Sequence, residues 1–349
     1  MAEPLLSVRN LSVAYLTDSA DVVAVDDVNL DVHEGEFLAV VGESGCGKST
    51  LLYAVAGLLS PPAEVIGGEI RFRGTDMIRM DDKALRHLRW RDYSVVLQSA
   101  MNALNPMKSI EAQFGDALKA HEDVSKTSRS AIRARTAEVL RLVGIDPVHA
   151  TSYPHQLSGG MRQRAMIAMA LLFTPQLVIM DEPTSALDVV AQRSLMTQVK
   201  DLQKRLGFAV VFVTHDMSLV RHYSDRLLVM YAGQLVESAA TEICFRQPLH
   251  PYSRGLLDAF PSIRGPRVPL VGIPGSPPDL ANPPTGCRFA PRCPKVMERC
   301  WTTKVEEFDV RESKVRCLLY DEIGADATSG KGAVARDDAV AATPASAAT

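Results

Sequence analysis

An apolar run from Phe37 to Val41 is followed at once by a loop rich in glycine and then by the helix-prone sequence KSTLLYAVAGLL. An apolar run without alternation is typical of a strand that is buried on both faces of a parallel sheet. Glycines allow the backbone to turn sharply between a strand and a helix. The sequence therefore predicts a strand, loop and helix unit within a mostly parallel sheet.

The loop matches the pattern GxxxxGKS, which binds phosphate groups where it joins a strand to a helix. Its backbone N–H groups can surround phosphate oxygens, and the helix N-terminus adds positive potential. Lys48 is expected to reach the terminal phosphates and Ser49 to ligate Mg²⁺, whereas Cys46 is expected to be a spacer. A chance glycine-rich turn is the alternative. The residues expected to bind ATP here are Gly42, Glu43, Ser44, Gly45, Cys46, Gly47, Lys48, Ser49 and Thr50.

Two carboxylates follow another apolar run. Leu177 to Met180 indicate a buried strand that ends at Asp181 and Glu182. Ligands bind at the carboxyl edge of parallel sheets, so both side chains are expected to face a ligand. Asp181 is expected to hold Mg²⁺ through water, and Glu182 to polarise the water that attacks the γ-phosphate. Either carboxylate alone could instead cap a helix.

The remaining pattern predicts an α/β domain. Alternating apolar residues from Leu5 to Val32 indicate short antiparallel strands, and an apolar run before His215 indicates another buried strand. Residues 99–164 are expected to form a helical insertion, with Gly144 ending one helix. The segment EIRFRG alternates like an edge strand. RLLVMYAGQLVES predicts a hairpin that turns near Gly233, at an edge of the first domain.

Composition narrows the functional classes. With 349 residues the chain is too long for one compact core, so a smaller appendage is expected. The net charge of -3 shows no basic excess, which argues against nucleic acid as a partner. The longest apolar stretch, Ala165 to Phe173, is far shorter than the roughly 20 residues of a membrane-spanning helix. The N-terminus carries no secretory pattern, so a cytoplasmic location is expected.

The segment LSGGMRQ places a serine and two glycines before an amphipathic helix. This makes a second anion site at a helix N-terminus, and one nucleotide scarcely needs two such sites in one subunit. With LVIMDEPTSALD further on, the chain resembles the ABC ATPase family over residues 1 to about 240. The resemblance implies a RecA-like core, an antiparallel β subdomain and a helical subdomain. It also implies ATP hydrolysis by a head-to-tail dimer.

In the implied dimer, ATP sits between the phosphate loop of one subunit and Ser158, Gly159 and Gly160 of the other. The resemblance further implies that Tyr15 stacks on adenine, Gln98 contacts Mg²⁺ and the transport partner, Asp188 lines the dimer interface and His215 contacts the γ-phosphate. Taken singly, such residues are more often structural, and their order and context favour the functional interpretation. The predicted catalytic residues are Glu182, His215 and Lys48, and the predicted Mg²⁺ ligands are Ser49, Gln98 and Asp181.

Proline is dense from Gln247 to Pro294, which predicts a loop-rich appendage. HPYSRGLL, GCRFAPRCP and the segment MNALNP resemble the ATP-binding subunits of bacterial oligopeptide and dipeptide importers. Such subunits act as unequal pairs with two membrane permeases and an extracytoplasmic solute-binding protein, at the cytoplasmic face of the membrane. Similar tails occur in nickel and other uptake systems, which leaves the solute open. We expect domains at 1–240 and 241–322 and a disordered tail at 323–349.

Four cysteines lie close together in the tail: Cys287, Cys293, Cys300 and Cys317. In a reducing compartment clustered cysteines favour metal binding, and sulfur ligation fits zinc or an iron-sulfur cluster. Their spacing differs from the paired CxxC of common zinc ribbons. The resemblance to peptide importers implies a 4Fe-4S cluster, with Zn²⁺ or unliganded thiols as alternatives. Cys244 is expected to be a buried apolar residue.

A soluble ABC protein that acts on ribosomes or DNA is the competing class. Such chains generally carry two ATPase cassettes or a coiled-coil insertion, whereas this sequence has one cassette and no long heptad run. A plain metal-binding module would leave the nucleotide motifs unexplained. Within transport, the importer-type tail argues against export.

Overall fold

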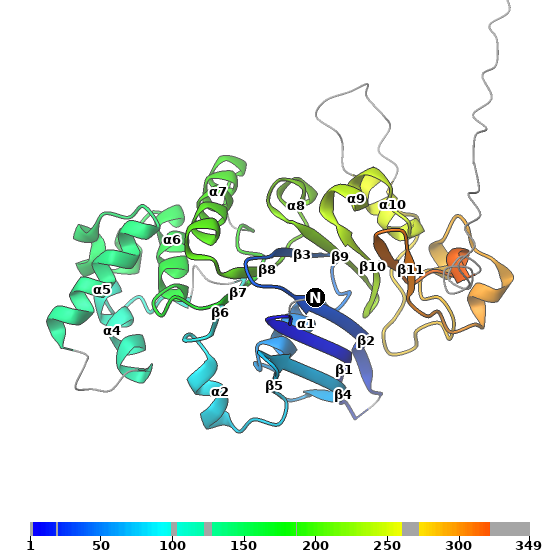
Figure 1. Cartoon of the computed structure of the whole chain (residues 1–349), viewed down its shortest axis with the longest axis horizontal. Helices are drawn as coiled ribbons and strands as arrows, with labels where there is room; N and C mark the ends of the chain where they lie inside the picture. Colours follow the sequence, from blue (N-terminus) through cyan, green and yellow to red (C-terminus); the bar gives the residue numbers. More distant parts are fainter. Residues whose placement is uncertain are drawn as a thin grey trace, which may run out of the picture.

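The computed structural model describes residues 3–18, 20–98, 103–121, 128–185, 187–259 and 272–321. This part of the chain contains two β-sheets, with helices on the faces of the larger one (Figure 1). None of its helices is long and apolar enough to cross a membrane. The C-terminal segment predicted to be disordered, 323–349, lies outside the described residues, as does the beginning of the expected helical insertion.

The smaller sheet is antiparallel, as the alternating N-terminal sequence predicts. Its strands are β1 (Leu6–Tyr15), β2 (Val22–Val32), β4 (Ala63–Phe72) and β5 (Thr75–Asp76), in the order β2-β1-β4-β5. The prediction that EIRFRG forms an edge strand is wrong, because this segment belongs to β4 and pairs on both sides. Arg73 and Gly74, both with positive φ, fold β5 back onto β4 in a tight hairpin turn and give β5 the edge.

The larger sheet has eight strands in the order β11-β12-β10-β9-β3-β8-β7-β6. They are β3 (Phe37–Val41), β6 (Tyr93–Val96), β7 (Leu177–Asp181), β8 (Ala209–Val213), β9 (Arg226–Tyr231), β10 (Gln234–Ala240), β11 (Phe308–Val310) and β12 (Ser313–Val315). The five strands from β9 to β6 are parallel, with β3 among them and buried throughout. The α/β architecture is therefore confirmed.

Helices join these strands and form the helical region. The α-helices are α1 (Lys48–Val55), α2 (Asp82–Leu88), α4 (Ile110–His121), α5 (Arg129–Leu142), α6 (Gly159–Ala170), α7 (Val189–Leu206), α8 (Met217–Tyr223), α9 (Thr241–Arg246) and α10 (Pro251–Asp258). Short 3-10 helices are η2 (Pro147–Thr151), η3 (Pro154–Gln156), η4 (Ala290–Arg292), η5 (Glu298–Trp301) and η6 (Leu318–Tyr320). Gly144 follows α5 with a φ of 67°, which confirms that the helix ends there.

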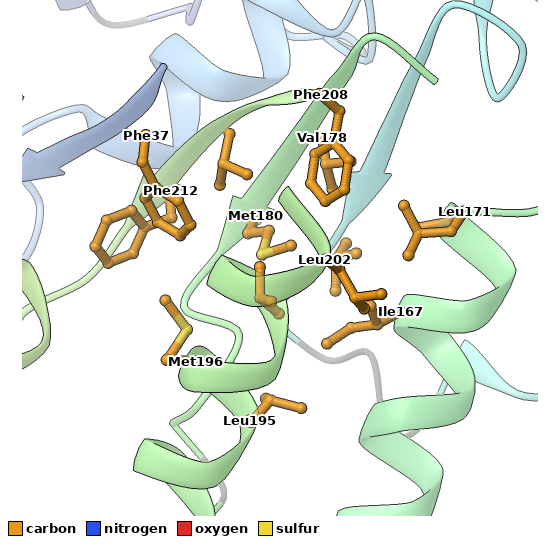
Figure 2. Close-up of a cluster of buried hydrophobic side chains, with 14 of the residues drawn as sticks. Phe37, Ile167, Leu171, Val178, Met180, Leu195, Met196, Leu202, Phe208 and Phe212 are labelled. Carbon is orange, nitrogen blue, oxygen red and sulfur yellow. The ribbon is translucent and has the colours of Figure 1, made fainter. Parts of the chain in front are cut away.

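Each face of the larger sheet contributes to a separate apolar core. Along β3, Phe37, Ala39 and Val41 belong to one core, and Leu38 and Val40 to the other, because side chains of a strand alternate between its two faces. The first core includes α6, α7 and α8, and Figure 2 shows side chains of α6 and α7 meeting those of the sheet. The second core joins α1 to both sheets. The start of α1 is thus fixed between them.

The region after β10, residues 241–321, is called the tail below, and its described part is built onto the larger sheet. β12 pairs with β10 in antiparallel fashion, and β11 pairs with β12. The predicted hairpin at Gly233 is present as β9 and β10, and β12 satisfies the backbone groups that β10 would otherwise expose. Tyr252 and Phe289 of the tail are also buried in the first core. The tail thus shares both a sheet and a core with the rest of the chain.

Candidate nucleotide-binding site

The loop between β3 and α1 has a conformation that glycine adopts most readily. Gly45 and Gly47 have φ values of 78° and 101°, which are strained for residues with a side chain. A Cβ on Gly47 would lie 2.1 Å from the carbonyl oxygen of Ala24, so the loop is packed directly against β2. The Lys48 ammonium donates to the Gly42 carbonyl oxygen at 2.9 Å. The positively charged Lys48 ammonium group is therefore held within the loop.

The Asp181 carboxylate faces the start of α1 from the end of β7. Ser49 Oγ donates to its Oδ1 at 3.3 Å, whereas its buried Oδ2 has no hydrogen-bond partner among the described residues. Burial raises the pKa of Asp181, and the charge of Glu182 raises it further. A buried carboxylate oxygen without a partner, close to a hydroxyl, fits a hard cation such as Mg²⁺.

Glu182 is in contact with side chains from two neighbouring strand ends. Its Oε2 accepts a hydrogen bond from Gln98 Nε2 at 3.0 Å, and its Oε1 lies 3.2 Å from His215 Nδ1. Its backbone has a φ of 44°, unusual for a residue other than glycine, and its N–H donates to Val213. The His215 side chain is 69% exposed and that of Glu182 is 20% exposed. The carboxylate is therefore accessible but held in a defined orientation.

Lys48, Ser49, Gln98, Glu182 and His215 line one cavity of about 550 Å³, whereas Asp181 is outside its wall and contacts Ser49. The predicted residues in its wall are Tyr15, Gly42, Ser44, Gly45, Gly47, Lys48, Ser49, Thr50, Gln98, Glu182 and His215. The Tyr15 hydroxyl lies 3.0 Å from Thr50 Oγ1, which anchors the ring at the end of β1. Ligand cavities of this size accommodate a molecule such as a nucleotide.

Three further residues of the wall are not predicted from the sequence: Val22, Ala24 and Leu280. Val22 pairs with Tyr15 in the β1–β2 register, so knowledge of the hairpin would have indicated it. Leu280 comes from the proline-rich tail, where no sequence signal points to the cavity.

Two residues of the loop are outside the cavity wall. Cys46 is buried with its Sγ 3.7 Å from Lys48 Nζ, and burial raises its pKa. A buried thiol of high pKa is a poor nucleophile, in agreement with the expected spacer role. Glu43 directs its carboxylate to Arg292 of the tail, at 2.7 Å.

The second glycine-containing segment lies at the start of α6. Ser158 is the N-cap of this helix, and its exposed hydroxyl accepts a hydrogen bond from the Met161 N–H at 3.3 Å. A Cβ on Gly160 would meet no described atom within 4 Å. Asp188 caps α7 by accepting from the Ala191 N–H at 2.8 Å. Within the described chain, neither Asp188 nor residues 158–160 line the cavity, so one subunit carries two separate candidate anion sites.

The four tail cysteines, Cys287, Cys293, Cys300 and Cys317, carry free thiols. Burial raises the pKa of Cys287, Cys293 and Cys317, the last to about 12, and the charge of neighbouring cysteines raises it further. The N–H groups of Lys295 and Met297 donate to the sulfurs of Cys293 and Cys300, each at 3.4 Å, as around metal-bound thiolates.

Nevertheless, no group of three or more His, Cys, Asp or Glu side chains in the described ranges is arranged to hold a metal ion. The geometry therefore gives no support to the predicted 4Fe-4S cluster or to the alternative Zn²⁺. Cys244 is fully buried, as expected.

A strand, glycine loop and helix that face an Asp-Glu pair, together with a separate helix N-terminus at Ser158, define an ATP-binding cassette. Residues 25–185 match the ABC transporter family, and residues 236–300 match the C-terminal region of oligopeptide/dipeptide transporters. The chain therefore belongs to the ABC transporter family of ATPases.

Individual relatives cover most of the chain. It is 44% identical over 301 residues to the dipeptide transport ATP-binding protein DppD of Bacillus subtilis, covering 85% of this chain and 89% of that protein. It is 41% identical over 308 residues to the oligopeptide transport ATP-binding protein OppD of Escherichia coli, covering 88% of this chain and 91% of that protein. Among solved structures, the dimeric post-hydrolysis cassette MJ0796 bound to ADP and Pi gives a TM-score of 0.61 at 29% identity, covering 68% of this chain and 98% of that chain.

Proposed function

We propose that this ATPase binds Mg-ATP in the cavity at the start of α1 and uses its hydrolysis to energise the import of dipeptides or oligopeptides. The observation that carries the proposal is that Lys48, Ser49 and Glu182 line one cavity, while Asp181 contacts Ser49 at its edge. These residues come from distant parts of the chain, and each has the chemistry that phosphoryl transfer requires at its position.

The phosphates are bound by the loop N–H groups and by Lys48, which exchanges its carbonyl partners for phosphate oxygens. Ser49, Gln98 and Asp181 would hold Mg²⁺, directly or through water, and the cation would neutralise charge on the phosphates. The unpartnered Asp181 oxygen supports this assignment. Tyr15 stacks on adenine at the end of the cavity where β1 and β2 meet.

Glu182 polarises the water that attacks the γ-phosphate. Its carboxylate is oriented by Gln98 and His215, and general bases of this kind must reach the water within hydrogen-bonding distance. His215 contacts the γ-phosphate from the exposed side of the cavity. The catalytic contribution is thus positioning and charge stabilisation by Lys48, Glu182 and His215.

The subunit acts in a head-to-tail nucleotide-sandwich dimer. Ser158, Gly159 and Gly160 bind the γ-phosphate that sits on the phosphate loop of the other ATPase subunit, and Asp188 lines the interface. The exposure of Ser158 and the open space around Gly160 support this arrangement, because both leave the α6 N-terminus free for an anion. Two nucleotides are then enclosed at one seam.

The transport role rests on the relatives named above and on the matching C-terminal region. In this role the chain pairs with a second, homologous ATPase subunit and docks through the Gln98 region on two transmembrane permeases. An extracytoplasmic solute-binding protein delivers the peptide. The chain lies peripherally at the cytoplasmic face of the membrane, and nucleic acid has no part in the cycle.

The tail cysteines are proposed to bind a 4Fe-4S cluster, with Zn²⁺ as the alternative ligand. Four thiols close together in the sequence, two of which accept backbone N–H groups at sulfur, favour this chemistry, although the thiols would have to rearrange to form the site. Metal analysis tests this proposal. Protein purified without oxygen should contain iron and acid-labile sulfide and should be brown. Stoichiometric zinc would replace the cluster, and neither metal would leave free thiols.

Glu182→Gln tests the catalytic assignment. The amide keeps the size of the side chain and one oxygen acceptor but cannot polarise water as a base, so turnover should fall by orders of magnitude while ATP affinity persists. Glu242→Gln is the matched control, because Glu242 is an exposed carboxylate on α9 that pairs with Arg246. Unchanged turnover in Glu182→Gln would refute the role of Glu182.

Copurification tests the transport assignment. The tagged chain should retain a second ATPase subunit and two permeases from detergent-solubilised membranes, and peptides should stimulate ATPase activity once the solute-binding protein is added. Stimulation by nickel instead of peptides would change the solute. Recovery with ribosomes or DNA would favour the competing class.

A further inference from the structure

The tail touches the phosphate loop at Glu43, and it holds two of that residue's polar groups. The Glu43 N–H donates to the Tyr252 hydroxyl at 2.9 Å, and its carboxylate accepts two hydrogen bonds from Arg292 at 2.7 and 2.9 Å. The third polar group, the Glu43 carbonyl oxygen, accepts from Lys48 Nζ at 2.8 Å. The residue that positions the Lys48 ammonium is therefore itself positioned by the tail.

The Arg292–Glu43 pair is more than a surface contact. The Arg292 side chain is only 4% exposed and the Glu43 side chain is 25% exposed. Bidentate ion pairs of this kind fix both the distance and the orientation of the two side chains. Arg292 also donates to the Pro274 carbonyl oxygen at 2.8 Å and lies over the Tyr231 ring. The hydrogen bond to Glu43 raises the pKa of the Arg292 guanidinium, so the charge is permanent.

The negative charge of Glu43 is electrostatically unfavourable in a loop that binds phosphates. A carboxylate at this position repels the triphosphate, and in a partly buried site the repulsion is only weakly screened. Arg292 cancels that charge from outside the cavity. Tyr252, which is fully buried, simultaneously fixes the backbone at the same residue.

We propose that Arg292 and Tyr252 are positioning residues for ATP binding, Arg292 by neutralising Glu43 and Tyr252 by holding its N–H. The C-terminal tail thereby completes the phosphate loop that the first domain supplies. This inference rests on the proposed nucleotide site, and a Lys48→Ala variant tests that site separately. If Lys48→Ala binds ATP like the unaltered chain, the proposed site is wrong, whatever happens at Arg292.

A second ion pair provides a matched control. Arg316, also from the tail and 5% exposed, pairs with Asp27 on β2 at 3.3 Å and donates to its carbonyl oxygen at 3.0 Å. It joins the tail to the smaller sheet without a hydrogen bond to the phosphate loop. Arg316→Met should therefore weaken the attachment of the tail but leave ATP affinity within about twofold of the unaltered chain.

The experiment measures the dissociation constant of Mg-ATP and the melting temperature of the nucleotide-free protein for each variant. Arg292→Met should weaken ATP binding roughly tenfold or more, because it leaves an unpaired carboxylate in the loop. Tyr252→Phe should weaken it several-fold with little loss of folding, since it removes only the hydroxyl. Tyr252→Phe keeps the test valid if Arg292→Met folds poorly.

Rescue separates positioning from general stability. Adding Glu43→Gln to Arg292→Met removes the unpaired charge, so the double variant should recover most of the lost ATP affinity. A loss that persists in the double variant would overturn the proposal for Arg292. Equal losses of ATP affinity in Arg292→Met and Arg316→Met would also overturn the proposal. Unchanged ATP affinity in both Arg292→Met and Tyr252→Phe would overturn it as well.

Discussion

Asp181 and Glu182 are neighbours in the sequence but occupy different environments. Asp181 is 2% exposed, with one oxygen on Ser49 and the other unpartnered among the described residues, whereas Glu182 opens toward Gln98 and His215. The first environment suits a cation and the second suits a water molecule. The division of roles therefore follows from the surroundings of each residue and not from its type.

A buried histidine gives a prediction for pH. His250 caps α10 by accepting the Tyr252 N–H at 3.0 Å, and burial lowers its pKa from 6.5 to about 3. Below pH 6.5 the unfolded chain binds a proton at this residue and the folded chain does not, so its contribution to stability is complete above pH 6.5 and is lost as the pH falls. By about pH 5 the loss should reach about 2 kcal/mol.

Urea unfolding of the unaltered chain and of His250→Asn should reveal this contribution. Asparagine keeps an acceptor for the Tyr252 N–H but does not titrate, so the variant should show a flatter dependence of unfolding free energy on pH between 6.5 and 4. Glu237, whose pKa burial raises, titrates in both proteins and cancels in the difference. Parallel pH profiles would contradict the prediction.

Many residues of the site could be predicted because short sequence motifs identify them. GKS and the Asp-Glu pair at the end of a strand require no knowledge of distant contacts. Arg292 could not be found in this way, because its partner Glu43 lies 249 positions away and no local pattern links them. Leu280 was missed for the same reason.

At the scale of elements, the phosphate loop predicts different effects for two of its glycines. A Cβ on Gly47 would lie 2.1 Å from the Ala24 carbonyl oxygen, whereas a Cβ on Gly45 would meet no described atom within 4 Å. Both positions have positive φ, so either substitution by alanine costs roughly 1 kcal/mol in backbone strain. Gly47→Ala should cost about 2 kcal/mol more, because backbone atoms must move.

Denaturant unfolding of the nucleotide-free protein measures this difference directly. Gly45→Ala serves as the control for strain alone. Equal destabilisation by the two substitutions would show that the loop is not packed against β2 as the structure has it.

The elements themselves were largely predictable, and the error concerns one sheet edge, because EIRFRG belongs to β4, which pairs on both sides. Periodicity identified β1, β3 and the hairpin of β9 and β10, since a buried strand must present apolar side chains. Whether a strand lies at an edge depends on what pairs with it. β12 is only three residues long and occurs after a long proline-rich segment, so its pairing with β10 has no signal in the sequence.

At the scale of the molecule, the shared sheet and core predict that the tail is needed for folding. Tyr252 and Phe289 are buried against the first domain, and burial of each contributes about 2 kcal/mol. A fragment of residues 1–240 would also expose the edge of β10. It should be poorly soluble, whereas a chain that ends at Asp321 should unfold in one cooperative transition. A soluble and cooperatively folded 1–240 fragment would contradict this view.

In the proposed mechanism, one subunit holds only part of each nucleotide site. The direct measurement is a structure of the Glu182→Gln protein, assembled with its second ATPase subunit and loaded with ATP and Mg²⁺. We predict that the γ-phosphate bound at Lys48 of this chain lies against the glycine-containing helix N-terminus of the other subunit, while Ser158 of this chain faces the other nucleotide. A triphosphate enclosed by one subunit, with Ser158 turned to solvent, would contradict the account.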